Sequence, residues 1–153
     1  MLKKISLFSD FSDEEIGKLA PLFSERNYLE GEIIIPEHAD NREMVILLSG
    51  AVAVEVALTL HQRSERLSLS MEEEPGRIIE WSVAIDTTRS GETASARALR
   101  PTRVLAADGE AILKICGENL CLGYRLMRRI LLLIASRLKD TRMQLVSSLA
   151  QYT

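Results

Sequence analysis

The sequence predicts a mainly β domain, a barrel or sandwich, with a short helix before it and a long helix after it. Between residues 25 and 107, short apolar runs alternate with turn-forming residues, which is typical of all-β barrels and sandwiches. On either side of this region, apolar residues recur at spacings of three and four, which is the helical pattern. The chain has 153 residues, of which 46% are hydrophobic, so we expect one domain over residues 1–153.

The first helix is expected over residues 12–23. Ser12 and Glu15 have the spacing of a capping box, in which the two residues satisfy each other's backbone N–H groups at the start of a helix. Pro21 is expected to end or kink the helix near Ala20, because proline lacks the N–H that an inner turn needs. The apolar face of this helix comprises Ile16, Leu19, Ala20 and Phe23.

The β region is expected over residues 25–107. Alternating apolar residues predict a strand at Val52–Leu58 and a partner strand at Leu67–Met71. The polar run His61–Glu65 between them predicts the hairpin. The other expected strands and turns are Tyr28–Glu30, Ile33–Ile35 and Met44–Leu48, with Gly31, Pro36, Ser49 and Gly50 as turn residues.

A long helix is expected over residues 119–149, with a length of about 45 Å. One apolar stripe along it comprises Tyr124, Met127, Leu131, Ile134, Leu138 and Leu145. A second apolar edge comprises Leu126, Ile130 and Leu133. A helix that is apolar on more than one side usually meets another chain or another helix. We therefore expect one face to pack on the β region and the other to be covered by a partner.

The segment Pro75–Leu99 carries the most informative motif. Pro75-Gly76 opens it and Thr93–Ala98 closes it. These residues match the two ends of a longer pattern, in which P-G-x-x-F-G-E-x-A is followed, after a variable loop, by P-R-[ST]-A-x-x-x-A. Two further matches, Gly31–Ile34 and Met44–Val52, come earlier. On these residues the chain resembles cyclic nucleotide-binding domains, the sensor modules of the catabolite activator family and of cyclic nucleotide-gated channels and kinases. The resemblance implies a jelly-roll barrel (a double-stranded β-helix) that binds a small ligand and forms a homodimer through its C-terminal helix.

The two residues that contact the nucleotide in this family are replaced. Trp81 stands where the ribose-binding Glu is expected, and Glu92 stands where the phosphate-binding Arg is expected, while Thr93 and Ala94 keep the pattern. Two unit charges about 4 Å apart interact by about 1 kcal/mol in water and about 4 kcal/mol at an effective dielectric constant of 20. Because Glu92 exchanges this attraction for repulsion, we expect that the chain does not hold cyclic AMP in the usual way.

The alignment of the ribose position leaves alternatives open. Counting from Pro75 places Trp81 at the position of the ribose-binding Glu. A shift by one residue makes Glu80 the ribose carboxylate but misplaces Ser82. In the first alignment Trp81 and Ser82 line the pocket, and Trp81 either stacks on a ligand or fills the pocket as a core residue.

A replacement for the missing cation has two candidates. Arg89, in the loop before Glu92, either faces the pocket or is a solvated loop residue. On the long helix, Arg137–Thr141 resembles the R-L-x-x-T run that carries a base-contacting Thr, so Thr141 is the candidate for that contact. Arg142, which follows it, either reaches the neighbouring subunit's pocket or lies at the surface or in the dimer seam.

Composition argues against several other functions. The net charge of -3 gives no sign of a nucleic-acid interface, and the apolar run Ile130–Ala135 is far shorter than the roughly 20 residues that span a bilayer. We expect no secretion signal in the first residues, and the two cysteines suit a cytoplasmic protein. His38 and His61 form no metal-binding motif, and no nucleophile–base pair can be argued. We therefore expect no metal, no cofactor and no enzyme activity, and no DNA-binding domain after the long helix.

The sequence thus predicts a homodimeric, cyclic nucleotide-binding-like regulatory domain, in which a cyclic nucleotide or another small ligand acts through the long helix. The alternative is a degenerate module for dimerisation or for binding a protein partner. In that case Trp81 fills the pocket and Glu92 closes it to anions. Both alternatives share one fold, so the fold does not decide between them.

Overall fold

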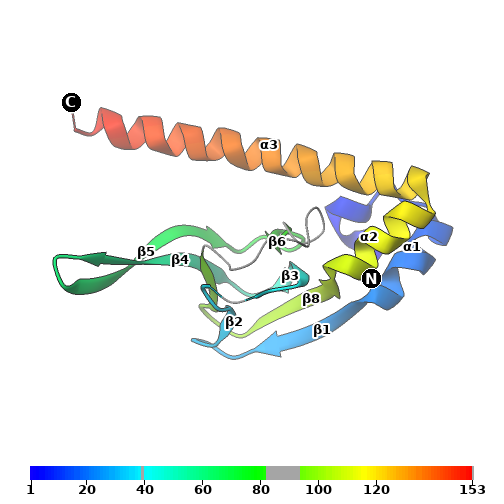
Figure 1. Cartoon of the computed structure of the whole chain (residues 1–153), viewed down its shortest axis with the longest axis horizontal. Helices are drawn as coiled ribbons and strands as arrows, with labels where there is room; N and C mark the ends of the chain where they lie inside the picture. Colours follow the sequence, from blue (N-terminus) through cyan, green and yellow to red (C-terminus); the bar gives the residue numbers. More distant parts are fainter. Residues whose placement is uncertain (39, 82–93, 153) are drawn as a thin grey trace.

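The computed structural model of the chain describes residues 1–38, 40–81 and 94–152. It contains two antiparallel four-stranded sheets, with helices at both ends of the chain and a long helix across the top (Figure 1). The helices are α1 (Asp13–Leu19), α2 (Gly109–Glu118) and α3 (Leu120–Ala150), with short 3₁₀ turns at Leu2–Lys4, Ser6–Phe8 and Ala20–Leu22. The strands are β1 (Phe23–Tyr28), β2 (Ile33–Ile35), β3 (Glu43–Ser49), β4 (Val52–Leu60), β5 (Arg63–Glu72), β6 (Ile78–Glu80), β7 (Ser95–Ala98) and β8 (Thr102–Asp108).

The strands are ordered β1-β8-β3-β6 in the first sheet and β2-β7-β4-β5 in the second. Apart from the β4–β5 hairpin, neighbouring strands in these sheets are distant in sequence, as in a jelly roll: Phe23 lies opposite Ala107, and Val52 lies opposite Ala98. The predicted mainly β fold with flanking helices is confirmed. In the described part of the chain, the two sheets face each other as a sandwich and do not join into one closed barrel.

The central strands of the first sheet, β3 and β8, are buried on both faces, whereas the edge strand β1 is largely exposed. Along β3, Met44 and Ile46 belong to a large core cluster that includes residues of all three α-helices, whereas Val45 and Leu47 belong to a smaller cluster between the two sheets. This alternation follows from the two-residue period of a strand. The molecule therefore has three layers: helices, first sheet and second sheet. Ile78 of β6 belongs to the helix-side cluster, so β6 lies under the helical layer.

The N-terminal segment confirms the predicted capping box and adds two elements that the sequence pattern did not indicate. The Ser12 hydroxyl accepts a hydrogen bond from the Glu15 N–H, and the Glu15 carboxylate accepts one from the Ser12 N–H. The helix gives way to a 3₁₀ turn at Pro21, as expected. Before it, two 3₁₀ turns bury Leu2, Ile5, Leu7 and Phe8. Such short turns have no 3.6-residue period, and so they escape a search for helical patterns.

The β4–β5 hairpin is tighter than the sequence predicts. The polar run His61–Glu65 was expected to form the turn, but the turn consists of His61 and Gln62 alone, with φ values of 49° and 67°. Two successive residues of positive φ make a type I′ turn, whose twist matches that of the flanking strands. The strands therefore continue almost to the tip. The apolar face expected on β5 is largely exposed there, with Leu67 51%, Leu69 48% and Met71 59% exposed.

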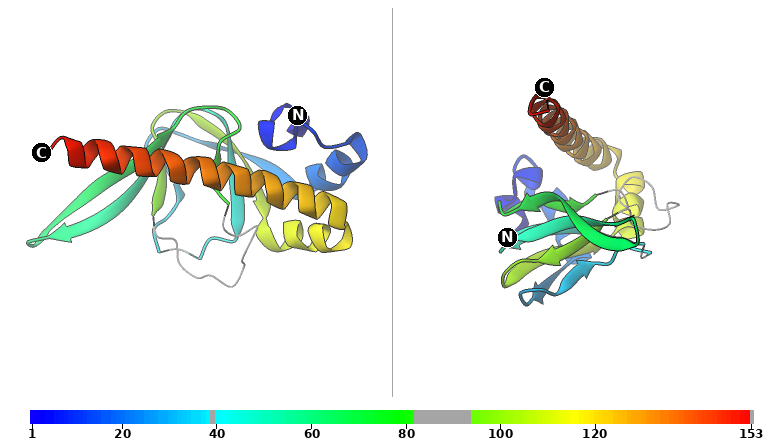
Figure 2. Two further views of the ribbon diagram at one scale, coloured as in Figure 1. Left: turned by 90° about the horizontal axis from the view of Figure 1, so that it is seen from above. Right: turned by 90° about the vertical axis from the view of Figure 1, so that its left-hand side faces the viewer.

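The predicted long helix is observed as α3, which runs along the length of the molecule (Figure 2). Asn119 separates it from α2 and caps it, because its side chain accepts a hydrogen bond from the Leu122 N–H at 3.2 Å. The second apolar edge packs on the body, where Leu126 and Ile130 are buried. Every described residue beyond Arg137 is exposed. In the first apolar stripe, Met127 and Ile134 pack against the large core cluster, whereas the other four residues are exposed. The stripe is called the outward stripe below and comprises Tyr124, Met127, Leu131, Ile134, Leu138 and Leu145.

Candidate ligand-binding site

The Pro75–Leu99 segment, called the cassette below, connects the two sheets. It reaches the first sheet in β6, where Glu80 lies opposite Val45 of β3, and it returns to the second sheet in β7, between β2 and β4. Its two ends are therefore held by different layers of the sandwich. A ligand in this segment would contact residues whose positions depend on both sheets.

The structure describes three of the seven cassette residues that the sequence singled out. Glu80 ends β6, Trp81 follows it directly, and Ala94 lies just before β7, all three half-buried. The remaining four lie outside the described residues, and their roles stay predictions: Ser82, Arg89, Glu92 and Thr93.

Trp81 packs against the large core cluster on the helix side of the first sheet. Its side chain is half-buried, so part of the indole remains accessible. An indole in this position contributes apolar area to the core and still presents a surface on which a flat ligand can stack. The two roles that the sequence left open for Trp81 are both compatible with this position.

An arginine from α3 holds the start of the cassette. Arg137 donates a hydrogen bond to the Ile78 carbonyl of β6, and its Nη2 lies 4.0 Å from Oε1 of Glu72 in β5. The Glu72 carboxylate is buried and accepts a hydrogen bond from Nε of Arg77 at 2.9 Å. These contacts join α3, β5 and β6 at the point from which the chain continues to Glu80 and Trp81.

The environment of Arg137 is that of a partly desolvated cation. Burial lowers the pKa of the Arg137 guanidinium, and the neighbouring Glu72 carboxylate counteracts that shift. Among the described residues, Nε of Arg137 is the buried side-chain polar atom without a hydrogen-bond partner. A partly buried charge is stable only when polar or charged groups surround it. The two partners of Arg137, the Ile78 carbonyl and the Glu72 carboxylate, both belong to the β sheets.

Sequence reasoning missed this role of Arg137, although it noted the R-L-x-x-T run that begins there. A signal was present, because Arg137 follows Ile130, Leu133 and Ile134 on the same side of the helix at spacings of three, four and seven. A charged residue that continues a buried apolar edge must find a partner in the layer beneath it.

A buried ion pair holds the other end of the cassette. Arg97 in β7 donates from Nε and Nη2 to Oε1 of Glu55 in β4, at 2.9 and 2.7 Å. Glu55 is only 5% exposed, and its backbone carbonyl accepts a hydrogen bond from the Ser95 hydroxyl at 3.3 Å. Arg97 belongs to the closing motif that carried the family resemblance. Its partner was not predicted, although Glu55 is the one acidic residue in the apolar strand β4.

The two candidate residues on α3 lie beyond its contact with the body. Thr141 and Arg142 are both exposed. The Thr141 hydroxyl donates to the Arg137 carbonyl of its own helix at 2.9 Å. Arg142 forms no ion pair with any part of the chain that the structure describes. Their predicted contacts with a ligand or with a neighbouring subunit stay predictions.

The described ranges hold neither a metal-binding cluster nor a membrane-spanning helix. Residues 1–38, 40–81 and 94–152 contain no group of three or more His, Cys, Asp and Glu side chains that could hold a metal ion. No helix in these ranges is both long enough and apolar enough to pass through a membrane.

The sequence matches no protein-family model and no curated protein. Solved structures match it well. A cyclic nucleotide-binding domain from Methylobacillus flagellatus is 23% identical, with a TM-score of 0.79 over 96% of this chain and 79% of that one. A candidate cyclic nucleotide-binding protein from Geobacter metallireducens is 25% identical, with a TM-score of 0.74 over 90% of this chain and 95% of that one.

A longer protein shares the same fold. The catabolite activator protein from Thermus thermophilus is 24% identical, with a TM-score of 0.70 over 91% of this chain. This chain spans 61% of its length. The chain therefore has the fold of cyclic nucleotide-binding domains, as the motifs of the cassette predicted.

Proposed function

We propose that this chain is a cyclic nucleotide-binding-like regulatory domain, a sensor and not an enzyme, that does not hold cyclic AMP in the usual way. The observation that carries the proposal is the contact of Arg137 with the Ile78 carbonyl, since it ties the cassette strand β6 directly to α3. A ligand that shifts the start of the cassette would change how firmly α3 is held. A ligand acts on such an equilibrium through its different affinity for the two arrangements.

Calorimetric titration with cyclic AMP and cyclic GMP tests the proposal. Because an acidic residue replaces the expected arginine at Glu92, we expect no binding at micromolar concentrations of either nucleotide. We expect the variant Glu92→Arg to gain measurable affinity. Glu118→Arg makes the same charge change on the exposed end of α2 and serves as the control, with no gain expected. Micromolar binding by the unaltered protein would overturn the proposed role of Glu92.

A second candidate function is a degenerate module with a filled pocket, which dimerises or binds a partner protein. The packing of Trp81 against the core cluster favours it. Trp81 is the only tryptophan, so its fluorescence reports on this site alone. A sensor whose ligand stacks on the indole should show a saturable change in emission across a screen of small anions. A filled pocket should show none, and Trp81→Ala should then destabilise the protein by about 3 kcal/mol or more.

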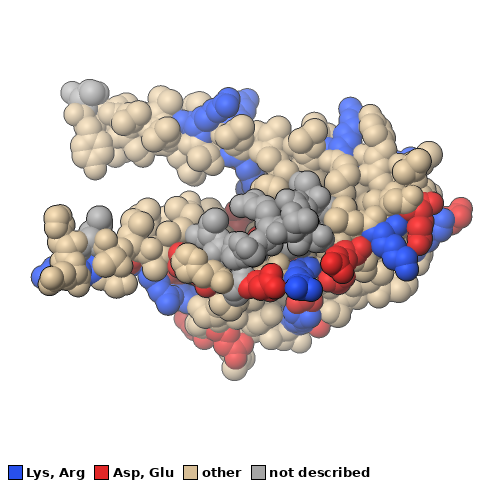
Figure 3. All heavy atoms as spheres, viewed as in Figure 1, with Lys and Arg blue, Asp and Glu red and all other residues tan. Residues whose placement is uncertain are grey.

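We also propose that the domain is a homodimer formed through the outward stripe of α3. Leu131, Leu138 and Leu145 of this stripe are 65%, 50% and 59% exposed, which is unusual for large apolar side chains spaced along one helix face. In Figure 3 the far half of α3 and the β4–β5 hairpin stand apart with an open groove between them, so the helix is accessible to a second copy. The free thiols of Cys116 and Cys121 are in keeping with the cytoplasmic location that we propose.

A further inference from the structure

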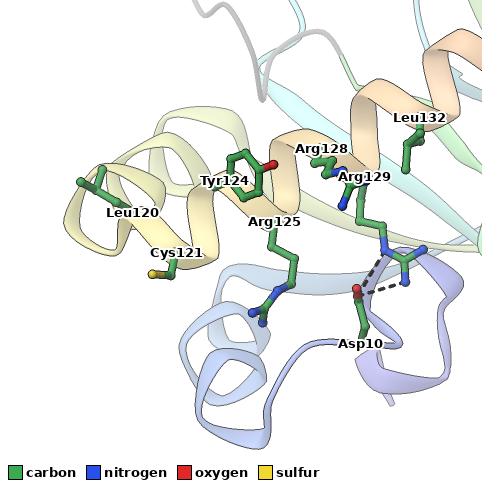
Figure 4. Close-up of a pocket in the computed structure, with 8 residues that line it drawn as sticks. All are labelled: Asp10, Leu120, Cys121, Tyr124, Arg125, Arg128, Arg129 and Leu132. Carbon is green, nitrogen blue, oxygen red and sulfur yellow. Dashed lines mark hydrogen bonds and ion pairs between the residues drawn. The ribbon is translucent and has the colours of Figure 1, made fainter.

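A second pocket lies away from the cassette, between the first half of α3 and the segment that precedes α1 (Figure 4). Its volume is about 660 Å³, which is in the usual range for small-molecule sites. None of the residues that the cassette resemblance singled out lines it. It lies beside the outward stripe of α3 and shares only Tyr124 with that stripe. The pocket is therefore separate from the candidate ligand site, and it adjoins the face of α3 on which the outward stripe lies at Tyr124.

Apolar side chains form much of the pocket wall. Leu120, Tyr124 and Leu132 are 76%, 71% and 56% exposed, although each has a large apolar side chain. All three lie along the first half of α3, with Arg125, Arg128 and Arg129 between Leu120 and Leu132 (Figure 4). Covering these side chains would be favourable in proportion to the apolar area removed from water.

The charged side chains in the pocket include one cation that has no charged partner among the described residues. Arg129 is paired with Asp10, 3.0 Å from Nη2 to Oδ1, and Arg125 is paired with Glu15 of α1. Arg128 forms no ion pair in the part of the chain that the structure describes. The pocket thus offers one uncompensated positive charge beside apolar walls. An uncompensated guanidinium favours a carboxylate, which it can bind through two parallel hydrogen bonds.

We propose that this pocket binds a small amphiphilic carboxylate, with its apolar part against Leu120, Tyr124 and Leu132 and its carboxylate on Arg128. The single uncompensated charge matches a monoanion, and the volume limits the ligand to small-molecule size. The proposal does not depend on the function of the cassette, so each can fail without the other.

The two cysteines make the test specific. Cys121 lines the pocket and is exposed, whereas Cys116 is buried and its burial raises the pKa of its thiol. Alkylation by iodoacetamide, which attacks the thiolate, should therefore occur at Cys121 well before Cys116. Decanoate is the probe, and decyltrimethylammonium, which has the same chain and the opposite charge, is its control. We expect decanoate to slow alkylation of Cys121 in a saturable manner and the cation to leave the rate unchanged.

Two arginine variants form a matched pair. Arg128 and Arg142 are both exposed on α3, two heptads apart, and neither forms an ion pair with a residue that the structure describes. Of the two, Arg128 lines the pocket. We expect Arg128→Gln to weaken protection by decanoate about tenfold, as loss of a charge-assisted hydrogen bond does. Arg142→Gln should leave protection unchanged. Circular dichroism establishes that both variants are folded.

Three results would overturn the proposal. The first is an absence of protection by decanoate up to millimolar concentrations. The second is equal protection by the cationic amphiphile, which would mean that only the apolar walls bind. The third is an equal effect of the two arginine variants, which would mean that α3 attracts anions along its whole length. Cyclic nucleotide calorimetry on the same samples reports on the cassette alone, so failure there is distinguishable from failure here.

Discussion

At the scale of single residues, the cassette is held by charges that the fold buries. Arg137 donates a hydrogen bond to a backbone carbonyl of one sheet and forms an ion pair with a carboxylate of the other. Glu55 accepts hydrogen bonds from the Arg97 guanidinium of the neighbouring strand. Both contacts join residues that are far apart in sequence, at separations of 59 for Arg137 and Ile78 and 42 for Arg97 and Glu55. A buried charge with such partners fixes the register of the parts it connects, because any shift leaves it unpaired.

Replacing Arg137 by methionine should destabilise the protein while keeping most of the aliphatic contact. The Ile78 carbonyl loses this donor, and Glu72 retains only Arg77, so we expect the free energy of unfolding to fall by about 1–3 kcal/mol. Urea unfolding followed by the fluorescence of Trp81 measures it. Arg142→Met removes an exposed arginine that forms no ion pair within the described ranges, and it should change the free energy by less than about 0.5 kcal/mol. Equal losses in the two variants would show that the contacts of Arg137 contribute no stability.

The capping box makes stability depend on pH in the acid range. Hydrogen bonding from the Ser12 N–H, assisted by Arg125, lowers the pKa of Glu15 from its ordinary value of 4.5. A carboxyl group whose pKa is lowered in the folded state stabilises that state at pH values above its ordinary pKa. This stabilisation is lost as the pH falls through the lowered pKa. We expect the free energy of unfolding to decrease as the pH falls below about 4.5.

Glu15→Gln isolates this contribution, because glutamine keeps the oxygen of the capping box but cannot be protonated there. Its unfolding free energy should fall less steeply with acid than that of the unaltered protein. A remaining slope is expected from Asp10 and Asp13, whose pKa values are lowered by Arg129 and Lys3. Identical slopes in chemical denaturation at a series of pH values would contradict the role given to Glu15.

At the scale of elements, the close crossing of α2 and α3 depends on a glycine. A Cβ built on Gly123 would lie 2.7 Å from the Cys116 carbonyl oxygen and 3.0 Å from its Cβ. Backbone atoms of a helix cannot move aside cheaply. The helices α2 and α3, which meet at Asn119, can therefore approach each other this closely only if residue 123 has no side chain.

We expect Gly123→Ala to lower the melting temperature and to reduce the free energy of unfolding by about 2 kcal/mol or more, because the two helices must separate. Gly117→Ala is the control within α2, since nothing lies within 4 Å of a Cβ built there. Alanine at that position should be neutral or should stabilise by up to about 1 kcal/mol through its higher helix propensity. Calorimetry distinguishes the two variants, and a neutral Gly123→Ala would refute the close-crossing argument.

Elements with a regular period could be predicted from the sequence, and elements without one could not. The outward stripe and the buried edge of α3 both follow from helical spacing, and most short strands follow from alternation. The turns at Leu2–Lys4 and Ser6–Phe8 have no period to detect. The hairpin turn was placed too broadly because its two residues of positive φ, His61 and Gln62, are not the usual Asn or Gly.

At the scale of the whole molecule, the motifs of the cassette predicted the fold, and the site could be predicted only in part. The positions of Glu80 and Trp81 follow from counting along the cassette, and the structure places them together at the end of β6. The anchors of the cassette depend on long-range pairing between β4, β7 and α3. No local pattern specifies such pairing, which arises when packing brings distant residues together.

The proposed dimer is tested at this scale by sedimentation. We expect the unaltered protein to sediment as a dimer at tens of micromolar. Leu138→Glu and Leu145→Glu place charges in the apolar seam, so together they should shift it to a monomer. Lys139→Glu introduces the same residue next to the stripe and should leave the dimer intact. A monomeric unaltered protein would contradict the proposal, as would dissociation caused equally by Lys139→Glu.

The exposed half of α3 also acts as a lever whose fulcrum is Arg137. About 20 Å of helix extends past this residue, because each helical residue advances the chain by about 1.5 Å. By the same helical geometry, a tilt of about 10° at Arg137, with the helix rigid, moves its far end by about 3–4 Å. A displacement at the start of the cassette too small to alter the sheets would thus be magnified at the end of α3. The length of helix that the body leaves uncovered determines how large that amplification is.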